Sequence, residues 1–175
     1  FPKDETTAIM IIATNVNKKF GRLQVFDNIS MSFNKGQTIA LIGPNGSGKT
    51  TFIKCLLGMV LPDSGFITIN NTNINHHWQY RQHIGYMPQM SRFPENMTIK
   101  QVIDMIKDIR AGSFQAMDEE LPEAFGLTAL YDKRMRTLSG GTRQKVSACL
   151  AFLFNPDILI LDEPTAGLDP VSSEI

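Results

Sequence analysis

The stretch GPNGSGKT, from Gly43 to Thr50, decides the fold of this chain. It fits the pattern G-x-x-x-x-G-K-[ST], whose glycines let backbone N–H groups curl around phosphate oxygens without Cβ clashes. An apolar run, Thr38–Ile42, precedes it and a helical pattern over Thr50–Leu61 follows it. These residues predict a strand buried on both faces, a phosphate-binding loop, and a helix whose N-terminus adds its positive dipole end.

Two side chains of this loop carry specific chemistry. Lys49 is expected to reach the β- and γ-phosphates, and the hydroxyl of Thr50 to bind Mg²⁺. The alternative is a chance match, which would rarely fall between a strand and a helix. The other expected phosphate contacts in the loop are Gly43, Pro44, Asn45, Gly46, Ser47 and Gly48.

A second apolar run, Ile158–Leu161, predicts another fully buried strand, and Asp162 and Glu163 follow it directly. Ligands of open α/β sheets bind at the carboxyl ends of the strands. Asp162 therefore suits the metal shell of Mg·ATP, and Glu163 is placed to polarise a water for attack on the γ-phosphate. The alternative is a solvated acidic turn before Pro164.

The remaining pattern predicts an α/β core with a helical insertion. Residues 9–16 and 66–69 have strand character, while the helix-favouring residues fall between about 90 and 152. Thr98 can cap one helix of the insertion, and Ser139–Phe154 predicts a second.

The composition excludes several classes of protein. The chain has 175 residues with 42% hydrophobic content, and 17 basic residues balance 17 acidic ones. A zero net charge argues against a broad basic face for nucleic acid, so no nucleic-acid partner is expected. No apolar run approaches the roughly 20 residues that span a bilayer. Two cysteines exclude a disulfide framework, and the adjacent His76 and His77 are more typical of a polar turn than of a metal site.

Several further motifs, in order, resemble the ATP-binding subunit of ABC transporters. KKFG (Lys18–Gly21) is similar to the loop whose aromatic ring stacks on adenine, a role that would fall to Phe20; a packed core ring is the alternative. GPNGSGKTT is similar to Walker A and adds Thr51 as a phosphate contact. GYMPQ (Gly85–Gln89) resembles the Q-loop, which implies that Gln89 reaches Mg²⁺ and the attacking water.

The resemblance also covers the C-terminal part of the chain. LSGGT (Leu138–Thr142) resembles the family signature LSGGQ, with Thr142 as a departure. It implies that Ser139, Gly140 and Gly141 meet the γ-phosphate of ATP held by a second subunit, although SGG alone is more typical of an N-cap. ILILDEPTAGLDP (Ile158–Pro170) is similar to Walker B and the D-loop, which would place Asp169 at a dimer interface.

The resemblance implies a fold and a domain plan. The fold is α/β, a P-loop NTPase core with an N-terminal antiparallel β subdomain and an inserted helical subdomain. We expect a single ATP-binding domain over residues 10–175, with a core at 10–89 and 153–175 and a helical subdomain at 90–152. Residues 1–9 are expected to be a leader or a cloning remnant. The family's switch histidine would lie beyond Ile175, so we expect a C-terminally truncated domain that binds ATP weakly and turns it over slowly.

The resemblance further implies an ATPase that works as a head-to-tail homodimer and drives transport with membrane-spanning permease subunits, on the cytoplasmic face of the cell membrane. Its cofactors would be ATP and Mg²⁺. Ser91–Thr98 is similar to ATPases paired with ABC-2-type permeases, which include the copper-processing system of nitrous-oxide-reductase maturation. The alternatives are a soluble ABC ATPase acting on ribosomes or DNA, and a regulatory sensor that binds ATP without turnover.

Overall fold

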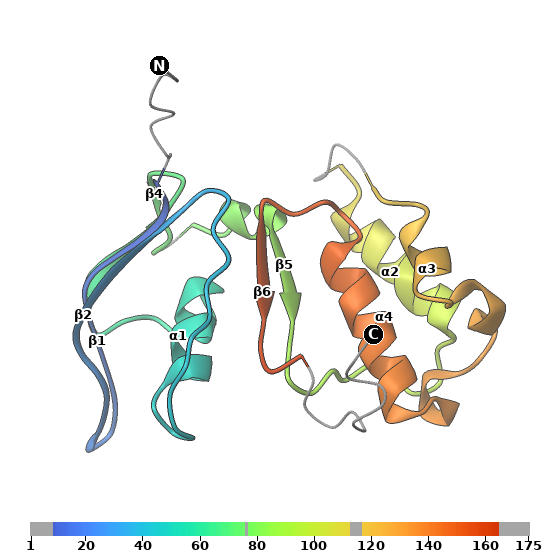
Figure 1. Ribbon diagram of the computed structural model, residues 1–175, viewed down its shortest axis with the longest axis horizontal. Helices are drawn as coiled ribbons and strands as arrows, with labels where there is room; N and C mark the ends of the chain where they lie inside the picture. The colour runs from blue at the N-terminus through green and yellow to red at the C-terminus, as the bar shows by residue number, and fades with distance from the viewer. Residues whose placement is uncertain (1–8, 76, 113–116, 165–175) are drawn as a thin grey trace. The chain divides into compact units, whose positions relative to one another are not determined.

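The computed structural model describes residues 9–75, 77–112 and 117–164. The chain divides into two compact units, Phe1–Arg81 and Gln82–Ile175. Figure 1 labels helices and strands of both units. Most of the expected leader at residues 1–9 lies outside the described residues, as do His76 and Asp169.

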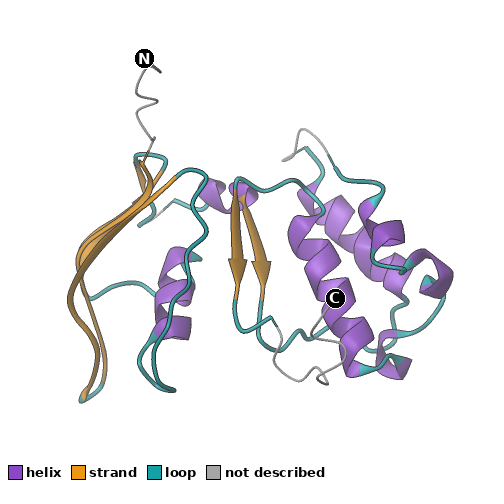
Figure 2. Cartoon of the chain, viewed as in Figure 1, coloured by secondary structure: helices purple, strands orange, loops and turns teal. Residues whose placement is uncertain are grey.

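The first unit is built on an antiparallel sheet with the strand order β2-β1-β3-β4. Its strands are drawn in orange in Figure 2. Its long hairpin joins β1 and β2 through Gly21, whose φ of 58° suits a residue without Cβ. This sheet confirms the expected antiparallel β subdomain. The strands are β1 (Ile9–Phe20), β2 (Leu23–Asn34), β3 (Ser64–Ile69) and β4 (Thr72–Asn73).

Helix α1 (Lys49–Leu56) packs through Phe52 against the sheet. The Phe52 ring meets Phe26 and Phe33 of β2 edge-on, with centroids 6.1 and 6.5 Å apart. The helix ends five residues before the expected Leu61, because Gly58 turns left-handed at φ 64°. The N–H groups of Gly58 and Met59 then donate to the last turn's carbonyls, an arrangement that stops the helix.

The run Thr38–Ile42 does not form the strand that its apolar residues predict. The structure gives it no regular secondary structure, and the Ile42 side chain is 92% exposed. A run of this kind becomes a strand only where a neighbouring strand supplies backbone partners. Within the described part of the first unit, the strand pairing is confined to β1–β4.

The second unit contains a two-stranded parallel sheet, in which β5 (Ile84–Met87) pairs with β6 (Ile158–Leu161). The register pairs Ile84 with Ile158 and Met87 with Leu161. Strand β6 confirms the second expected strand, but only Ile158 of it is buried and Leu161 is exposed. Full burial needs neighbours on both faces, which an isolated strand pair does not have.

The helices of the second unit form its core together with the segment before β6. Helix α4 contacts β5, α2 and α3. Thr98 caps α2 as expected, in a reciprocal capping box with Gln101. No helix in the described part of either unit is long and apolar enough to cross a membrane. The elements are α2 (Ile99–Arg110), α3 (Leu121–Ala124), α4 (Gly140–Phe152) and the 3-10 helices Thr128–Leu130 and Met135–Thr137. A further 3-10 helix, Gln79–His83, includes the last residues of the first unit and the first of the second.

Candidate functional site

The phosphate-binding loop of the first unit depends on glycine backbone. Gly46 and Gly48 adopt φ of 81° and 94°, in the left-handed region that favours glycine. A Cβ on Gly48 would lie 2.8 Å from the side chains of Val25 and Phe26, whereas Gly46 has open space around it. The loop therefore rests against β2 at its end and stays exposed in its middle.

Lys49 folds back over this loop. Its ammonium group donates to the carbonyl oxygens of Gly43 and Pro44, at 2.8 and 3.0 Å. The N–H of Ser47 donates to Pro44, which closes the turn. The loop thus holds a cation inside its curve at the start of α1, and this positive charge together with the backbone donors suits the binding of phosphate oxygens.

Phe20 ends β1 at the tip of the hairpin and is 50% exposed. This exposure is not that of a packed core ring, which was the alternative. Lys18 lies over the ring at 5.2 Å from its centroid and pairs with Asp63 at 2.9 Å. The bond from Lys18 lowers the pKa of the exposed Asp63 carboxyl. The stacking of Phe20 on adenine stays a prediction.

In the second unit the structure brings together Gln89, Asp162 and Glu163. The side-chain amide of Gln89 donates to Glu163 Oε2 at 2.6 Å, across 74 residues of sequence. The pairing of β5 with β6 explains this contact, because both side chains follow the carboxyl ends of neighbouring parallel strands.

The two carboxylates of this group have different surroundings. Asp162 is only 5% exposed, and its N–H donates to the carbonyl of Met87 at 2.9 Å. Burial and the nearby Asp162 charge raise the pKa of Tyr86. Glu163 is exposed and adopts a left-handed φ of 50°, a strained state for a residue with Cβ. The buried carboxylate of Asp162 therefore lies next to the accessible carboxylate of Glu163, which accepts a hydrogen bond from Gln89.

The signature residues open α4. Ser139 is its N-cap, accepting from the Thr142 N–H at 3.2 Å, and the two hydroxyl groups lie 2.9 Å apart. Thr142, where the family signature has Gln, therefore strengthens the cap. Ser139 and Gly140 are exposed and Gly141 is half-buried, so this helix N-terminus is accessible.

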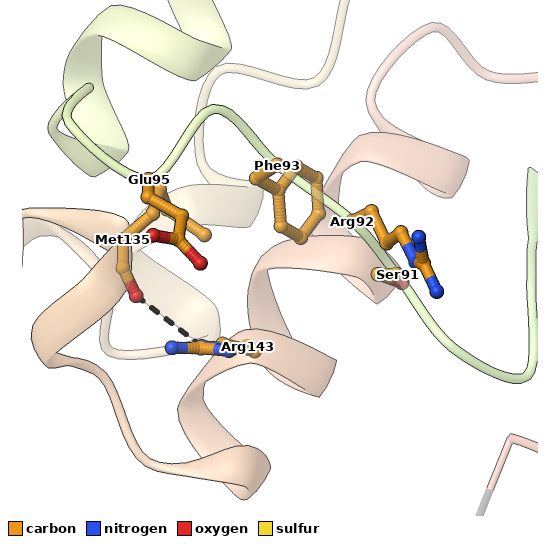
Figure 3. A pocket seen from close by; sticks show the side chains of 6 residues that line it. All are labelled: Ser91, Arg92, Phe93, Glu95, Met135 and Arg143. Atoms are coloured by element: carbon orange, nitrogen blue, oxygen red, sulfur yellow. Dashed lines mark hydrogen bonds between the residues drawn. The ribbon is translucent and has the colours of Figure 1, made fainter.

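A cavity of about 290 Å³ lies beside α4 in the second unit. It is lined by Ser91, Arg92, Phe93 and Glu95 together with Met135 and Arg143 (Figure 3). Arg143 Nε donates to the carbonyl of Met135 at 3.2 Å, so the cavity wall and the signature helix are joined. Apolar Phe93 and Met135 and three charged side chains line the space.

Sequence reasoning missed Ser91, Gln144 and Ser147. Ser147 is 4% exposed and its hydroxyl bonds to that of Ser91, while Gln144 Nε2 donates to the carbonyl of Pro164 at 3.4 Å. One signal was present in the sequence: Ser147 is a polar residue between the apolar Val146 and Cys149. The hydrogen-bond partners of these side chains could be identified only from the structure.

The remaining histidine and cysteine side chains were considered above as metal ligands or disulfide partners. No group of three or more His, Cys, Asp or Glu residues that could hold a metal occurs among the described residues. His83 pairs with Asp157 at 2.9 Å. Cys55 and Cys149 are buried and free, and burial raises the pKa of each thiol to about 11.

Comparison with known proteins identifies the family of this chain. The family model described as ABC transporter matches residues 26–166. The arginine transport ATP-binding protein ArtM of Bacillus subtilis (strain 168) is 36% identical over 92% of this chain and 70% of its own length. The lipopolysaccharide export system ATP-binding protein LptB of Escherichia coli (strain K12) is 35% identical over 93% of this chain and 70% of its own.

Solved structures agree with the fold. An ATP-binding subunit of an ABC transporter superposes with a TM-score of 0.83 at 28% identity, covering 94% of this chain and 70% of that one. An ATP-binding cassette solved in its ADP conformation gives 0.77 at 30% identity, covering 96% and 74%. The expected P-loop NTPase fold is thereby confirmed. The chain belongs to the ABC transporter family and is one of its ATP-binding, ATP-hydrolysing subunits.

Proposed function

We propose that this chain hydrolyses Mg·ATP with Glu163 as the general base and Gln89 as its partner, and that this turnover drives transport through a membrane permease. The bond between Gln89 and Glu163 carries the proposal. It holds an accessible carboxylate at the carboxyl end of β6, next to the buried Asp162. A carboxylate held in this way can accept the proton of a water as that water attacks the γ-phosphate.

The nucleotide is bound mainly by backbone and by one cation. Backbone N–H groups of the loop between Asn45 and Thr51 would donate to the phosphate oxygens, and Lys49 would exchange its carbonyl partners for the β- and γ-phosphates. Phe20 offers an exposed ring for the adenine.

Mg²⁺ fits the donor chemistry of three residues. The hydroxyl of Thr50, the amide oxygen of Gln89 and the carboxylate of Asp162 are oxygen donors of the kind that Mg²⁺ accepts. Because the amide nitrogen of Gln89 is bonded to Glu163, its oxygen is the atom that can face a cation. The metal would neutralise phosphate charge during transfer.

A second copy of the chain completes each site in this proposal. The exposed N-terminus of α4, with Ser139, Gly140 and Gly141, offers amides and a helix dipole to a γ-phosphate held by the partner subunit. Sedimentation of the Glu163→Gln variant tests this dimer. We expect dimers with Mg·ATP and monomers without it, and a monomer in both conditions would contradict a sandwich of two copies.

The permease is proposed to dock at the cavity beside α4, on the cytoplasmic face of the cell membrane. Phe93 and Met135 can receive an apolar side chain, while Arg92 and Glu95 can pair with charges at its flanks. In a pull-down from solubilised membranes, the Arg92→Glu variant should recover less of the permease than the native protein does. Its ATP binding should be unchanged. Lys145→Glu, an equal charge reversal at an exposed α4 position, is the matched control.

The testing experiment is a pull-down of the tagged full-length protein from detergent-solubilised native membranes. A multi-spanning membrane protein at near-equal stoichiometry supports transport and identifies the permease branch. Recovery with ribosomal proteins or DNA would overturn the transport proposal. That alternative is not favoured, since the relatives named above are ATP-binding proteins of transport and export systems.

A further inference from the structure

One face of α4 carries two polar side chains that reach the segments holding Gln89 and Glu163. Gln144 and Ser147 are three residues apart and therefore share a helix face. Gln144 Nε2 donates to the carbonyl of Pro164, the residue directly after Glu163. The hydroxyl of Ser147 bonds to that of Ser91, two residues after Gln89.

The burial of Ser147 makes its bond informative. Its side chain is 4% exposed, and its neighbours Val146 and Cys149 are completely buried. A hydroxyl in such a place costs free energy unless it is bonded, whereas alanine would fill the site without that cost. The bond to Ser91 therefore fixes the path of the chain just after Gln89.

Glu163 needs an equivalent restraint. It is exposed, and its left-handed φ of 50° is a state that surrounding contacts must maintain. Gln144 supplies one such contact, because its Nε2 donates to the carbonyl oxygen of the next residue, Pro164, at 3.4 Å. The same face of one helix thus restrains both backbone segments that carry the 2.6 Å bond between Gln89 and Glu163.

We propose that Gln144 and Ser147 are positioning residues, through which α4 sets the geometry of the Gln89–Glu163 pair. Ser139, the N-cap of helix α4, is the residue proposed to meet the partner's nucleotide. A displacement of α4 caused by contact at its N-terminus would be passed to the pair that acts on this chain's own nucleotide. This inference rests on the proposed catalytic roles of Gln89 and Glu163.

Steady-state ATP hydrolysis by the full-length protein in its membrane complex tests the proposal. Ser147→Ala and Gln144→Glu should each lower kcat by about ten- to a hundredfold, the size of effect that a misplacement of up to about 1 Å can cause. KM for ATP should not change, because neither side chain is proposed to touch the nucleotide. Lys145→Ala, at an exposed position of the same helix, should leave kcat unaltered.

A double-mutant cycle separates positioning from simple stabilisation. In a Gln89→Ala background, Ser147→Ala should lower kcat no further, since Ser147 acts through Gln89. Equal losses in both backgrounds would overturn the proposal, as would a raised KM with unchanged kcat. If Ser147→Ala does not fold, Ser91→Ala tests the same bond, and Ser91→Thr should restore kcat by keeping the hydroxyl.

The outcomes distinguish this inference from the proposed function. If Glu163→Gln retains turnover, the catalytic assignment fails and the positioning role falls with it. If Glu163→Gln abolishes turnover while Ser147→Ala and Gln144→Glu behave as the native protein, only the positioning role is wrong.

Discussion

The phosphate-binding loop of the first unit and the Gln89–Glu163 pair of the second are built in opposite ways. The loop consists of consecutive residues, and its shape comes from glycine φ angles and the bonds of Lys49 to Gly43 and Pro44. The pair joins side chains 74 residues apart. It lies where β5 and β6 pair, and α4 bonds to the segments that follow both strands.

This difference indicates which substitutions should impair nucleotide binding and which should impair turnover. A backbone site loses function when its glycines or its lysine change, and distant substitutions should leave it intact. A site made by long-range contacts should respond to substitutions that never touch the nucleotide. Binding and turnover should therefore be separable by mutation, with binding following the loop and turnover following the pair.

The largest separation is expected for Glu163→Gln. Loss of a general base should lower turnover by about 10²- to 10⁴-fold, while ATP binding stays within a few-fold of the native value. Phosphate release and equilibrium dialysis measure the two quantities. Glu119→Gln, an exposed acid away from the pair, is the control. Undiminished turnover would show that Glu163 is not the base and would favour a nucleotide sensor or another mechanism.

Lys49→Ala should produce the reverse pattern, with binding affected directly. A lost charge-assisted bond to phosphate costs about 1.5–3 kcal/mol, or roughly a ten- to hundredfold weaker ATP affinity. Lys54→Ala, an exposed lysine on the same helix, should leave affinity unchanged. Titration calorimetry with Mg·ATP makes the measurement. An affinity equal to that of the native protein would mean that backbone donors alone bind the phosphates.

The same contrast explains how much the sequence predicts. The loop, the cap at Thr98 and the start of α4 depend on neighbouring residues, so their patterns suffice. The end of α1 was misjudged because the apolar pattern continues past Gly58, whose backbone conformation stops the helix. Features that depend on neighbouring residues can be predicted from the sequence. The apolar pattern alone does not show whether a glycine such as Gly58 ends the helix or continues it.

Non-local features were harder to predict. The strand expected at Thr38–Ile42 was wrong, because an apolar run specifies burial but not the strand that must pair with it. The residues Asp162 and Glu163 were identifiable from Walker B, yet the bond to Gln89 and the contacts of Gln144 and Ser147 depend on how segments far apart are packed.

Two glycine variants test whether the end of the loop packs against β2 while its middle does not. Both Gly46→Ala and Gly48→Ala place a Cβ at positive φ, which costs about 1–2 kcal/mol. Only at Gly48 would that Cβ lie 2.8 Å from Val25 and Phe26, which adds about 1–3 kcal/mol of overpacking. Urea unfolding should therefore find Gly48→Ala the less stable variant. Equal free energies of unfolding would mean that β2 yields to the added methyl group.

The remaining prediction concerns the thiols, one in each unit, and its effect is confined to alkaline pH. Burial raises the pKa of Cys55 and of Cys149 from 9.0 to about 11. Between pH 9 and pH 11 the unfolded chain loses these protons and the folded chain keeps them, so the free energy of unfolding falls as pH rises, by up to about 1.4 kcal/mol per pH unit for each thiol. Below about pH 8 the thiols are almost fully protonated in both states and add almost no slope.

Unfolding measured at pH 8, 9 and 10 tests this for Cys55→Ala and Cys149→Ala, each against the native chain. Each variant should lose part of the alkaline slope, because each removes one buried titrating group. Equal reductions would mean that the two cores exclude water alike, although one supports a backbone loop and the other a pair of distant side chains. If only one variant changes the slope, the thiol of the other unit already meets solvent, and the contrast between the units extends from their sites into their cores.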